Sequence, residues 1–129
     1  MAYGSLLTDT VQSSTTGTPP QFNDGSGTQV GTLCRAWVSF TGSTGAKLAS
    51  FNVSSITRAS AGVYTVTFTN AMPDTNYSAT GACAQGSGNA MFFSGDVSQT
   101  VSTTQYQFQL RNYLASNLDA TYVYAQFFR

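Results

Sequence analysis

Aspartates are the only acidic side chains in this sequence, so any acid–base chemistry would depend on them. A glycosidase needs two carboxyl groups about 5–10 Å apart, one of them with a raised pKa. Asp96 and Asp119 are the pair to consider, but both stand among turn-forming residues, and we rank this reading far below a structural one. Asp74 follows Pro73, where an aspartate usually hydrogen-bonds its own backbone in a turn. We therefore expect structural roles for these carboxylates.

Other reactive residue types are scarce or uninformative. The chain has no histidine, the commonest proton shuttle and metal ligand. Lys47 would need a serine partner to form a nucleophile, and with 35 Ser and Thr residues such a pairing arises by chance. Cys34 and Cys83 do not make a disulfide framework, and in a reducing compartment two buried thiols are the default. We predict no catalytic residue, no cofactor and no metal site.

Length and charge narrow the function further. The 129 residues fit one domain, and only 8% are charged, compared with about a quarter in an average domain. A net charge of +0 argues against a nucleic-acid partner, which a basic patch normally recognises. No apolar run approaches the ~20 residues that span a bilayer, so we expect no membrane insertion. The N-terminus lacks the basic and apolar regions of a signal peptide, which predicts a protein made in a cytoplasm and not secreted.

Alternation with a period of two dominates the chain, which indicates strands and not helices. It is most regular over residues 104–111 and 62–69, where aromatic and aliphatic residues alternate with Gln or Thr. Turn-rich segments separate the expected strands, a spacing typical of an antiparallel sandwich or barrel. Residues 112–118 could instead hold one helical turn. The other expected strands are 34–40, 47–53, 76–84, 90–94, a weaker one near 97–102, and 119–128.

The last of these strands is apolar on both sides. Val123, Ala125 and Phe127 alternate with aromatic residues, and a strand coated on both faces must be covered on both faces. In so small a domain, a second subunit is the expected cover. Trp37 also points away from the inward side of its strand; it could stack on a sugar, but an interface role is favoured. The predicted oligomer interface consists of Trp37, Tyr122, Tyr124 and Phe128.

The first residues differ in kind from the rest. Large apolar residues are thinly spread there through Ser, Thr, Gly and Pro, so the segment cannot bury itself. It is either a flexible leader or an extended arm ordered by a neighbour, and the alternation in residues 7–11 favours the arm. We predict an N-terminal attachment arm over residues 1–32, anchored by Leu7, Val11 and Phe22, and a β-sandwich domain over residues 33–129.

Four strings in order, at residues 34–40, 50–57, 62–68 and 71–77, resemble a module of tailed-bacteriophage virion proteins. Members of this group are described as tail-fibre, tail-spike or head-fibre proteins. The leader at residues 4–14 and 17–22 also resembles the segment that precedes the module, so the similarity covers roughly residues 5–77. Residues 78–129 resemble these proteins only in being a variable, β-rich end that finishes with an aromatic strand and a final Phe-Arg.

The resemblance implies a small β-sandwich that assembles as a trimer on the outside of a phage particle, with no enzymatic residues. Together with the strand pattern it predicts a jelly-roll-like antiparallel sandwich of about seven or eight strands. The expected location is the virion, and the expected function is a structural fibre or spike module for host attachment. The alternative is a capsid decoration protein, of cement or head-fibre type, whose arm clips onto capsid subunits. The predicted partners are two further copies of the chain, tail, baseplate or capsid proteins bound through the arm, and a host surface glycan as a further candidate.

Overall fold

The computed structural model describes residues 8, 10–12, 14, 22–23, 25–27, 29–31, 33–85, 90–95 and 100–129. The chain divides into two compact units, Met1–Leu33 and Cys34–Arg129. In the first unit, β1 (Phe22–Asn23) pairs antiparallel with β2 (Gln29–Gly31), and Phe22 lies opposite Gly31. An attachment role for the first unit stays a prediction.

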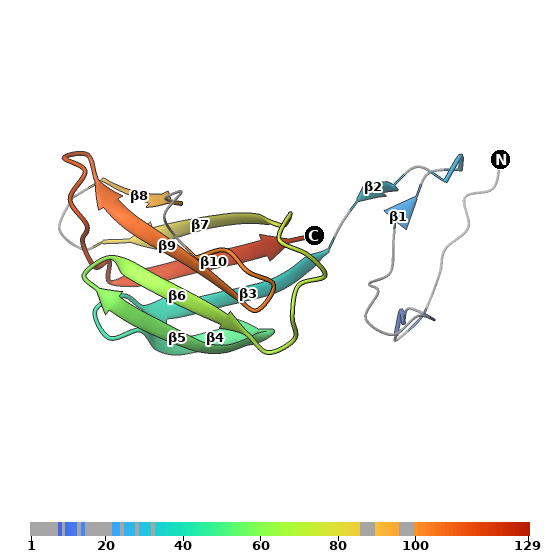
Figure 1. Cartoon of the computed structure of the whole chain (residues 1–129), viewed down its shortest axis with the longest axis horizontal. Coiled ribbons are helices and arrows are strands. Elements are labelled where there is room, and N and C mark those ends of the chain that lie inside the picture. Colours follow the sequence, from blue (N-terminus) through green and yellow to red (C-terminus); the bar gives the residue numbers. More distant parts are fainter. Residues whose placement is uncertain are drawn as a thin grey trace. The chain divides into compact units, whose positions relative to one another are not determined.

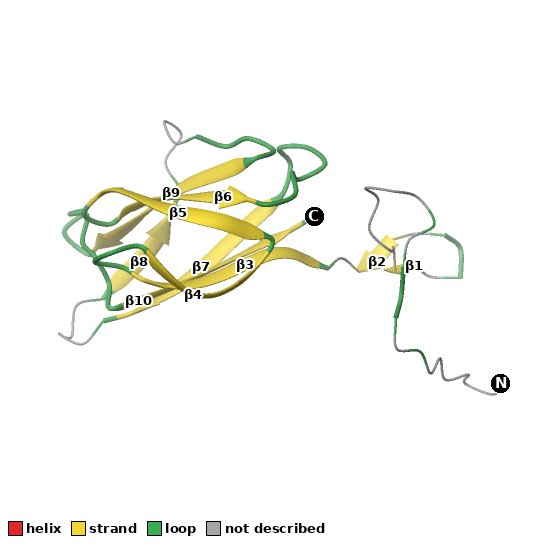
Figure 2. Ribbon diagram, turned by 90° about the horizontal axis from the view of Figure 1, so that it is seen from below, coloured by secondary structure: helices red, strands yellow, loops and turns green. Residues whose placement is uncertain are grey.

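The second unit consists of two four-stranded antiparallel sheets, seen as two layers in Figures 1 and 2. One sheet has the order β4-β3-β10-β7 and the other the order β5-β6-β9-β8. No helix occurs in the described part of the chain, so the segment expected as a possible helical turn holds the end of β9, a turn at residues 113–115 and a bridge from Asn117 to Arg111. The predicted all-β sandwich of about eight strands is therefore confirmed. Its strands are β3 (Cys34–Thr41), β4 (Ala46–Phe51), β5 (Val53–Ser60), β6 (Val63–Phe68), β7 (Ser78–Ala84), β8 (Met91–Ser94), β9 (Gln105–Asn112) and β10 (Tyr122–Phe128).

The core lies between the sheets and is built by the alternation that the sequence shows. Along β6, Tyr64, Val66 and Phe68 point inward and are buried, while the threonines between them point outward. The rings of Phe40 and Tyr64 meet edge to face, with centroids 5.0 Å apart. Such contacts between aromatic rings from both sheets fix the distance between the layers. The fully buried large side chains are Phe40, Tyr64, Phe108, Phe127, Leu110, Val38, Val66 and Val123.

Three pairs of neighbouring strands are also consecutive in the sequence. Strands β3–β4, β5–β6 and β8–β9 are consecutive neighbours that stay within one sheet. Strand β10 pairs with β3 on one side and β7 on the other, and β9 likewise pairs with β6 and β8. The finer jelly-roll description stays a prediction.

One expected strand is in fact two. Residues 47–53 were predicted as a single strand, but β4 ends at Phe51 and β5 begins at Val53. Asn52 makes the corner between the two sheets with a φ of 54°, a conformation that asparagine tolerates better than most residues. Its amide nitrogen donates to the carbonyl oxygens of Arg35 (3.0 Å) and Asn70 (3.1 Å), and its side-chain oxygen accepts from the Asn70 amide (2.7 Å). These bonds hold a corner that no hydrophobic pattern reveals.

The weaker strand expected near residues 97–102 is reduced to an isolated bridge between Val101 and Tyr106, while residues 96–99 lie outside the described part of the chain. The turn role of Asp74 is confirmed, because its Oδ1 accepts the Asn76 amide at 2.8 Å. Asp74 also pairs with Arg129, whose Nη2 lies 2.7 Å from Oδ2, and this ion pair ties the C-terminus to the turn.

Candidate functional site

The outward side of β10 carries exposed aromatic rings, although the other side of the same strand is fully buried. Val123, Ala125 and Phe127 are fully buried, whereas Tyr122 and Tyr124 on the opposite side of the same strand are 44% and 40% exposed. Phe128, at the end of the strand, is half-buried. Because β10 lies between β3 and β7, these outward rings stand at the middle of their sheet and not at its edge.

A second pair of rings extends this surface across the sheet. Trp37 on β3 is 39% exposed and lies opposite Phe51 on β4, which is 55% exposed. On the other side of Trp37, Gln126 of β10 occupies the matching position. Phe51 was not among the predicted interface residues, because the corner at Asn52 hid which way it points. We call Trp37, Phe51, Tyr122, Tyr124 and Phe128 the aromatic face, which contains all four predicted interface residues.

A shallow hollow lies on the same sheet where β7 adjoins β10. It has a volume of about 170 Å³ and is lined by Thr80, Gly81, Ala82, Tyr124 and Gln126. The hollow exists because β7 presents only small side chains beside the large ring of Tyr124. Gly81 cannot be enlarged, since a Cβ there would overlap the Phe93 ring and lie 2.7 Å from the Tyr124 carbonyl oxygen.

The outer face of the other sheet is chemically different. Across its strands, Thr57, Thr65 and Gln107 are paired in one row. Ser55, Thr67 and Gln105 are paired in another. Hydroxyl and amide groups on this face can remain hydrated at little cost. Exposing an aromatic ring to water costs free energy, whereas leaving a hydroxyl or amide group in water does not. Of the two outer faces, the aromatic one is therefore the better candidate for contact with another molecule.

Comparison with known proteins places this geometry in no established group. No family model, curated protein or solved structure matches the chain. The function must therefore be inferred from the residues themselves and from the resemblance to phage virion modules.

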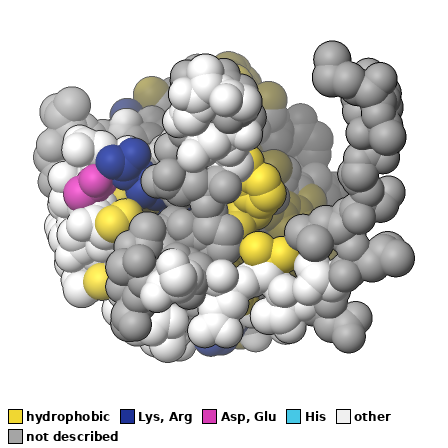
Figure 3. Space-filling model, turned by 90° about the vertical axis from the view of Figure 1, so that its right-hand side faces the viewer, with side chains coloured by type: hydrophobic (Ala, Val, Ile, Leu, Met, Phe, Trp, Pro, Cys, Tyr) yellow, Lys and Arg dark blue, Asp and Glu magenta, His cyan; other side chains and the backbone are white. Residues whose placement is uncertain are grey.

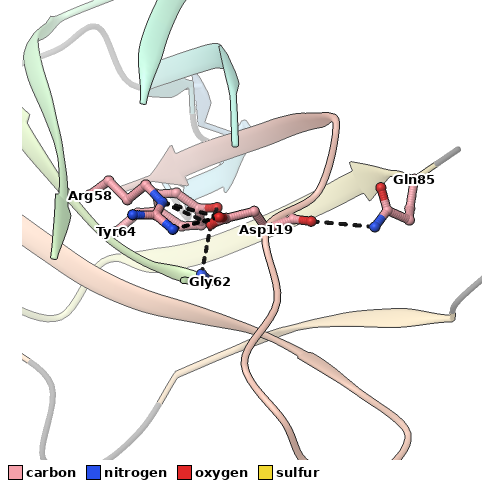
Figure 4. Close-up of polar contacts among 5 residues, drawn as sticks. All are labelled: Arg58, Gly62, Tyr64, Gln85 and Asp119. Atoms are coloured by element: carbon pink, nitrogen blue, oxygen red, sulfur yellow. Dashed lines mark hydrogen bonds and ion pairs between the residues drawn. The ribbon is translucent and has the colours of Figure 1, made fainter. Parts of the chain in front are cut away.

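Asp119 is at the centre of the densest polar cluster, shown in Figure 4. Its carboxylate accepts from Arg58 Nη2 (2.6 Å) and Nε (3.0 and 3.2 Å), from the Gly62 amide (2.9 Å) and from the Tyr64 hydroxyl (2.7 Å). These donors come from β5, β6 and the turn between them, whereas Asp119 precedes β10. The cluster thus ties one sheet to the chain that enters the other.

The electrostatics of Asp119 favour its ionised form. Partial burial opposes ionisation, but hydrogen bonds from Arg58, Gly62 and Tyr64 outweigh it and lower the pKa of the carboxyl. Burial and the bond to Asp119 together raise the pKa of the Tyr64 hydroxyl. A glycosidase acid needs a raised carboxyl pKa, which is the opposite of what Asp119 has. Asp96, its suggested partner, lies outside the described residues.

Other predicted residues and sites can be placed as follows. Leu7 lies outside the described residues, while Val11 and Phe22 of the first unit are 62% and 47% exposed. Both cysteines are free thiols, and burial raises the pKa of Cys83.

Within the described ranges, no three His, Cys, Asp or Glu side chains gather into a metal-binding group. The same ranges contain no helix with the length and apolar character to cross a bilayer.

Charge is sparse on the surface as well as in the sequence. In the view of Figure 3, the charged side chains form small spots, and uncharged polar side chains and backbone cover most of the described surface. Lys47 is engaged in the fold, since its Nζ donates to the carbonyl oxygens of Val53 (2.8 Å) and Ser54 (3.2 Å). Contacts made by such a surface depend on shape and hydrogen bonds more than on long-range attraction.

We expect stability to fall in acid and to stay level near neutrality. The pKa values of Asp119 and Asp74 are lowered in the folded chain, each by an arginine and a backbone amide. A depressed folded pKa contributes stability above the unfolded value, about 3.9 for aspartate, and this contribution is lost as the pH falls through the folded value. Thermal melting followed by circular dichroism should give similar midpoints at pH 7 and 5 and a lower one below about pH 4. An unchanged midpoint at low pH would show that neither ion pair contributes.

Proposed function

We propose that this chain is a structural protein of a tailed-phage virion, a small trimeric fibre or spike module that assembles through its aromatic face. The observation that carries the proposal is the two-sided apolar character of β10. Its inner residues are fully buried, while Tyr122 and Tyr124 stay 44% and 40% exposed at the middle of a sheet. Burying that face against other copies removes several rings from water at once.

The trimeric state is supported by the resemblance over residues 5–77 to phage virion modules. Three copies related by rotation give a closed assembly in which every aromatic face is used. The polar face of each copy, rich in Thr and Gln, then remains on the outside in water. One outer face would serve assembly and the other would face water, as expected of a protein displayed on a particle surface.

Host attachment is the proposed role of the loop after β9. Tyr113 and Leu114 at its tip are 68% and 67% exposed, among the most exposed large apolar side chains in the described chain. Asn112 Oδ1 accepts the amides of Leu114 (3.0 Å) and Ser116 (2.9 Å), and the Ala115 amide donates to the Asn112 carbonyl oxygen (3.0 Å). The tip is therefore pre-organised, which lowers the entropy lost on binding a receptor. Three tips on one trimer would add avidity.

A capsid decoration protein is the second candidate, and the first unit favours it. Val11 and Phe22 there are 62% and 47% exposed, so this unit presents apolar anchors of its own. An arm with such anchors suits clipping onto capsid subunits. The trimer and the aromatic face are common to both candidates.

Antibody labelling of intact particles distinguishes the candidates. Gold on the tail supports the host-attachment role, gold on the capsid supports decoration, and no gold on purified particles would overturn the virion assignment.

The attachment loop is tested by a Tyr113→Ser, Leu114→Ser double variant, with Val101→Ser, another exposed apolar residue at 45% and outside the sheet of the aromatic face, as control. We expect the double variant to slow adsorption to host cells roughly tenfold or more, as loss of a binding hot spot does, and the control to adsorb normally. Equal adsorption of both variants and wild type would refute the loop's role.

A further inference from the structure

The edges of the two sheets are not equally protected. Four strands stand at edges, β4, β7, β5 and β8, and an unprotected edge offers unpaired backbone groups to any other strand. Strand β4 carries Lys47, and its register shifts between Ser39 and Phe40 of its partner strand. Strand β5 carries Arg58 and has two register shifts against β6, and β8 is only four residues long. Charge, irregular pairing and shortness are the usual devices that prevent edge pairing.

Within the described part of the chain, strand β7 carries none of these devices, although β8 of the other sheet lies close to it. Its seven residues, Ser78–Ala84, include no charge and no proline. It pairs with β10 in an uninterrupted register from Ser78 to Ala84. Its outward side chains are Ser or Thr hydroxyls and Ala methyls, so they do not obstruct a neighbouring strand. In Figure 1, β7 borders its sheet on the side away from β3.

The surface beside β7 is also shaped to receive a side chain. The 170 Å³ hollow lined by Thr80, Gly81, Ala82, Tyr124 and Gln126 lies immediately inside this edge. A strand added along β7 would gain main-chain hydrogen bonds, and its alternate side chains would point toward the hollow and the Tyr124 ring. Main-chain bonds for affinity and pockets for alternate side chains are the two elements of strand addition.

The geometry points to β7 as the acceptor of an extended segment from a second copy of this chain, the stretch around Val11. Val11 is 62% exposed, and residues 10–12 belong to no strand. Thr10, Val11 and Gln12 are uncharged like β7 itself, and in an extended strand Val11 points to the side opposite Thr10 and Gln12. Val11 would fill the hollow against Tyr124, which covers both an exposed apolar side chain and an unprotected edge.

This inference rests on the proposed assembly and adds a second contact to it. Each copy would donate one segment and accept one, a head-to-tail arrangement that closes when the rotation completes a ring. The aromatic face would hold the copies together, and the exchanged strand would interlock them. The arm's partner would then be a neighbouring copy of the same chain.

Hydrogen exchange on the full-length protein tests the inference. In the wild-type assembly, the alternate β7 amides that face away from β10 should be protected. Val11→Asp should speed their exchange at least tenfold, and Ala82→Lys, which places a charge on the edge, should do the same. Phe22→Asp is the matched control, since it alters an exposed apolar residue of the same unit, and it should leave β7 exchange unchanged.

Each outcome decides the question. If these β7 amides exchange freely in a wild-type trimer, or stay protected in Val11→Asp, the inference fails while the proposed trimer stands. If the wild-type protein is a monomer by mass, the proposed assembly fails and the strand exchange fails with it. Loss of protection in Val11→Asp with retention of the trimer supports both.

Discussion

Asp119→Asn is expected to lower the free energy of unfolding by about 2–3 kcal/mol, the range for a lost charged partner of several hydrogen bonds. The Asp119 side chain is only 21% exposed, and its carboxylate serves Arg58, Gly62 and Tyr64 together. An amide keeps the shape but offers one acceptor oxygen where the carboxylate offers two. At least one donor, with the Arg58 charge, then loses its acceptor in a partly buried site.

Urea unfolding followed by circular dichroism measures this loss as a lower midpoint with an unchanged m-value. The chain supplies its own control in Asp74→Asn, since Asp74 makes the same two-pronged bond to Arg129 but is 39% exposed. Exposed ion pairs contribute little, so the control should unfold close to wild type. Equal effects of the two substitutions would show that the position of Asp119 between the sheets gives it no special role.

The strands were largely predictable, and this cluster was not. Alternation is a local property, so β6, β9 and β10 could be placed from the residues of each strand alone. Asp119 instead contacts residues 55 to 61 positions away in the sequence, and no pattern within one strand indicates such a contact. Its turn-like surroundings indicated a loop aspartate and nothing about its partners.

The corner at Asn52 shows the same limit. Residues 53–60 are mostly exposed Ser, Thr, Arg and Ala, so β5 lacks the apolar alternation that marks β6 and β10. Long-range hydrogen bonds from Asn52 to Arg35 and Asn70 turn the chain there, and the turn decides that Phe51 faces outward beside Trp37. The aromatic face was predictable on β3 and β10, where each strand shows its own two sides, but not on β4.

Tyr124→Lys is expected to dissociate the proposed trimer into folded monomers. Tyr124 lies at the middle of β10, 40% exposed, with Ser39 and Ala82 as its cross-strand neighbours. A lysine there remains hydrated in the monomer, so the fold should survive. In the assembly its charge would be buried against the apolar rings of other copies without a partner. Loss of a central interface residue costs 2 kcal/mol or more, roughly a 30-fold weakening of each contact.

Sedimentation velocity at micromolar concentrations measures the change in mass. The matched control is Gln107→Lys, which places the same charge on a central strand of the opposite, polar face, opposite Thr65. That variant should remain trimeric, because the polar face is expected to stay in water. A Tyr124→Lys protein that stays trimeric, or a Gln107→Lys protein that dissociates, would place the subunit contact elsewhere. Because both lysines add the same charge at the middle of a sheet, any difference between the variants reflects which outer face the copies share.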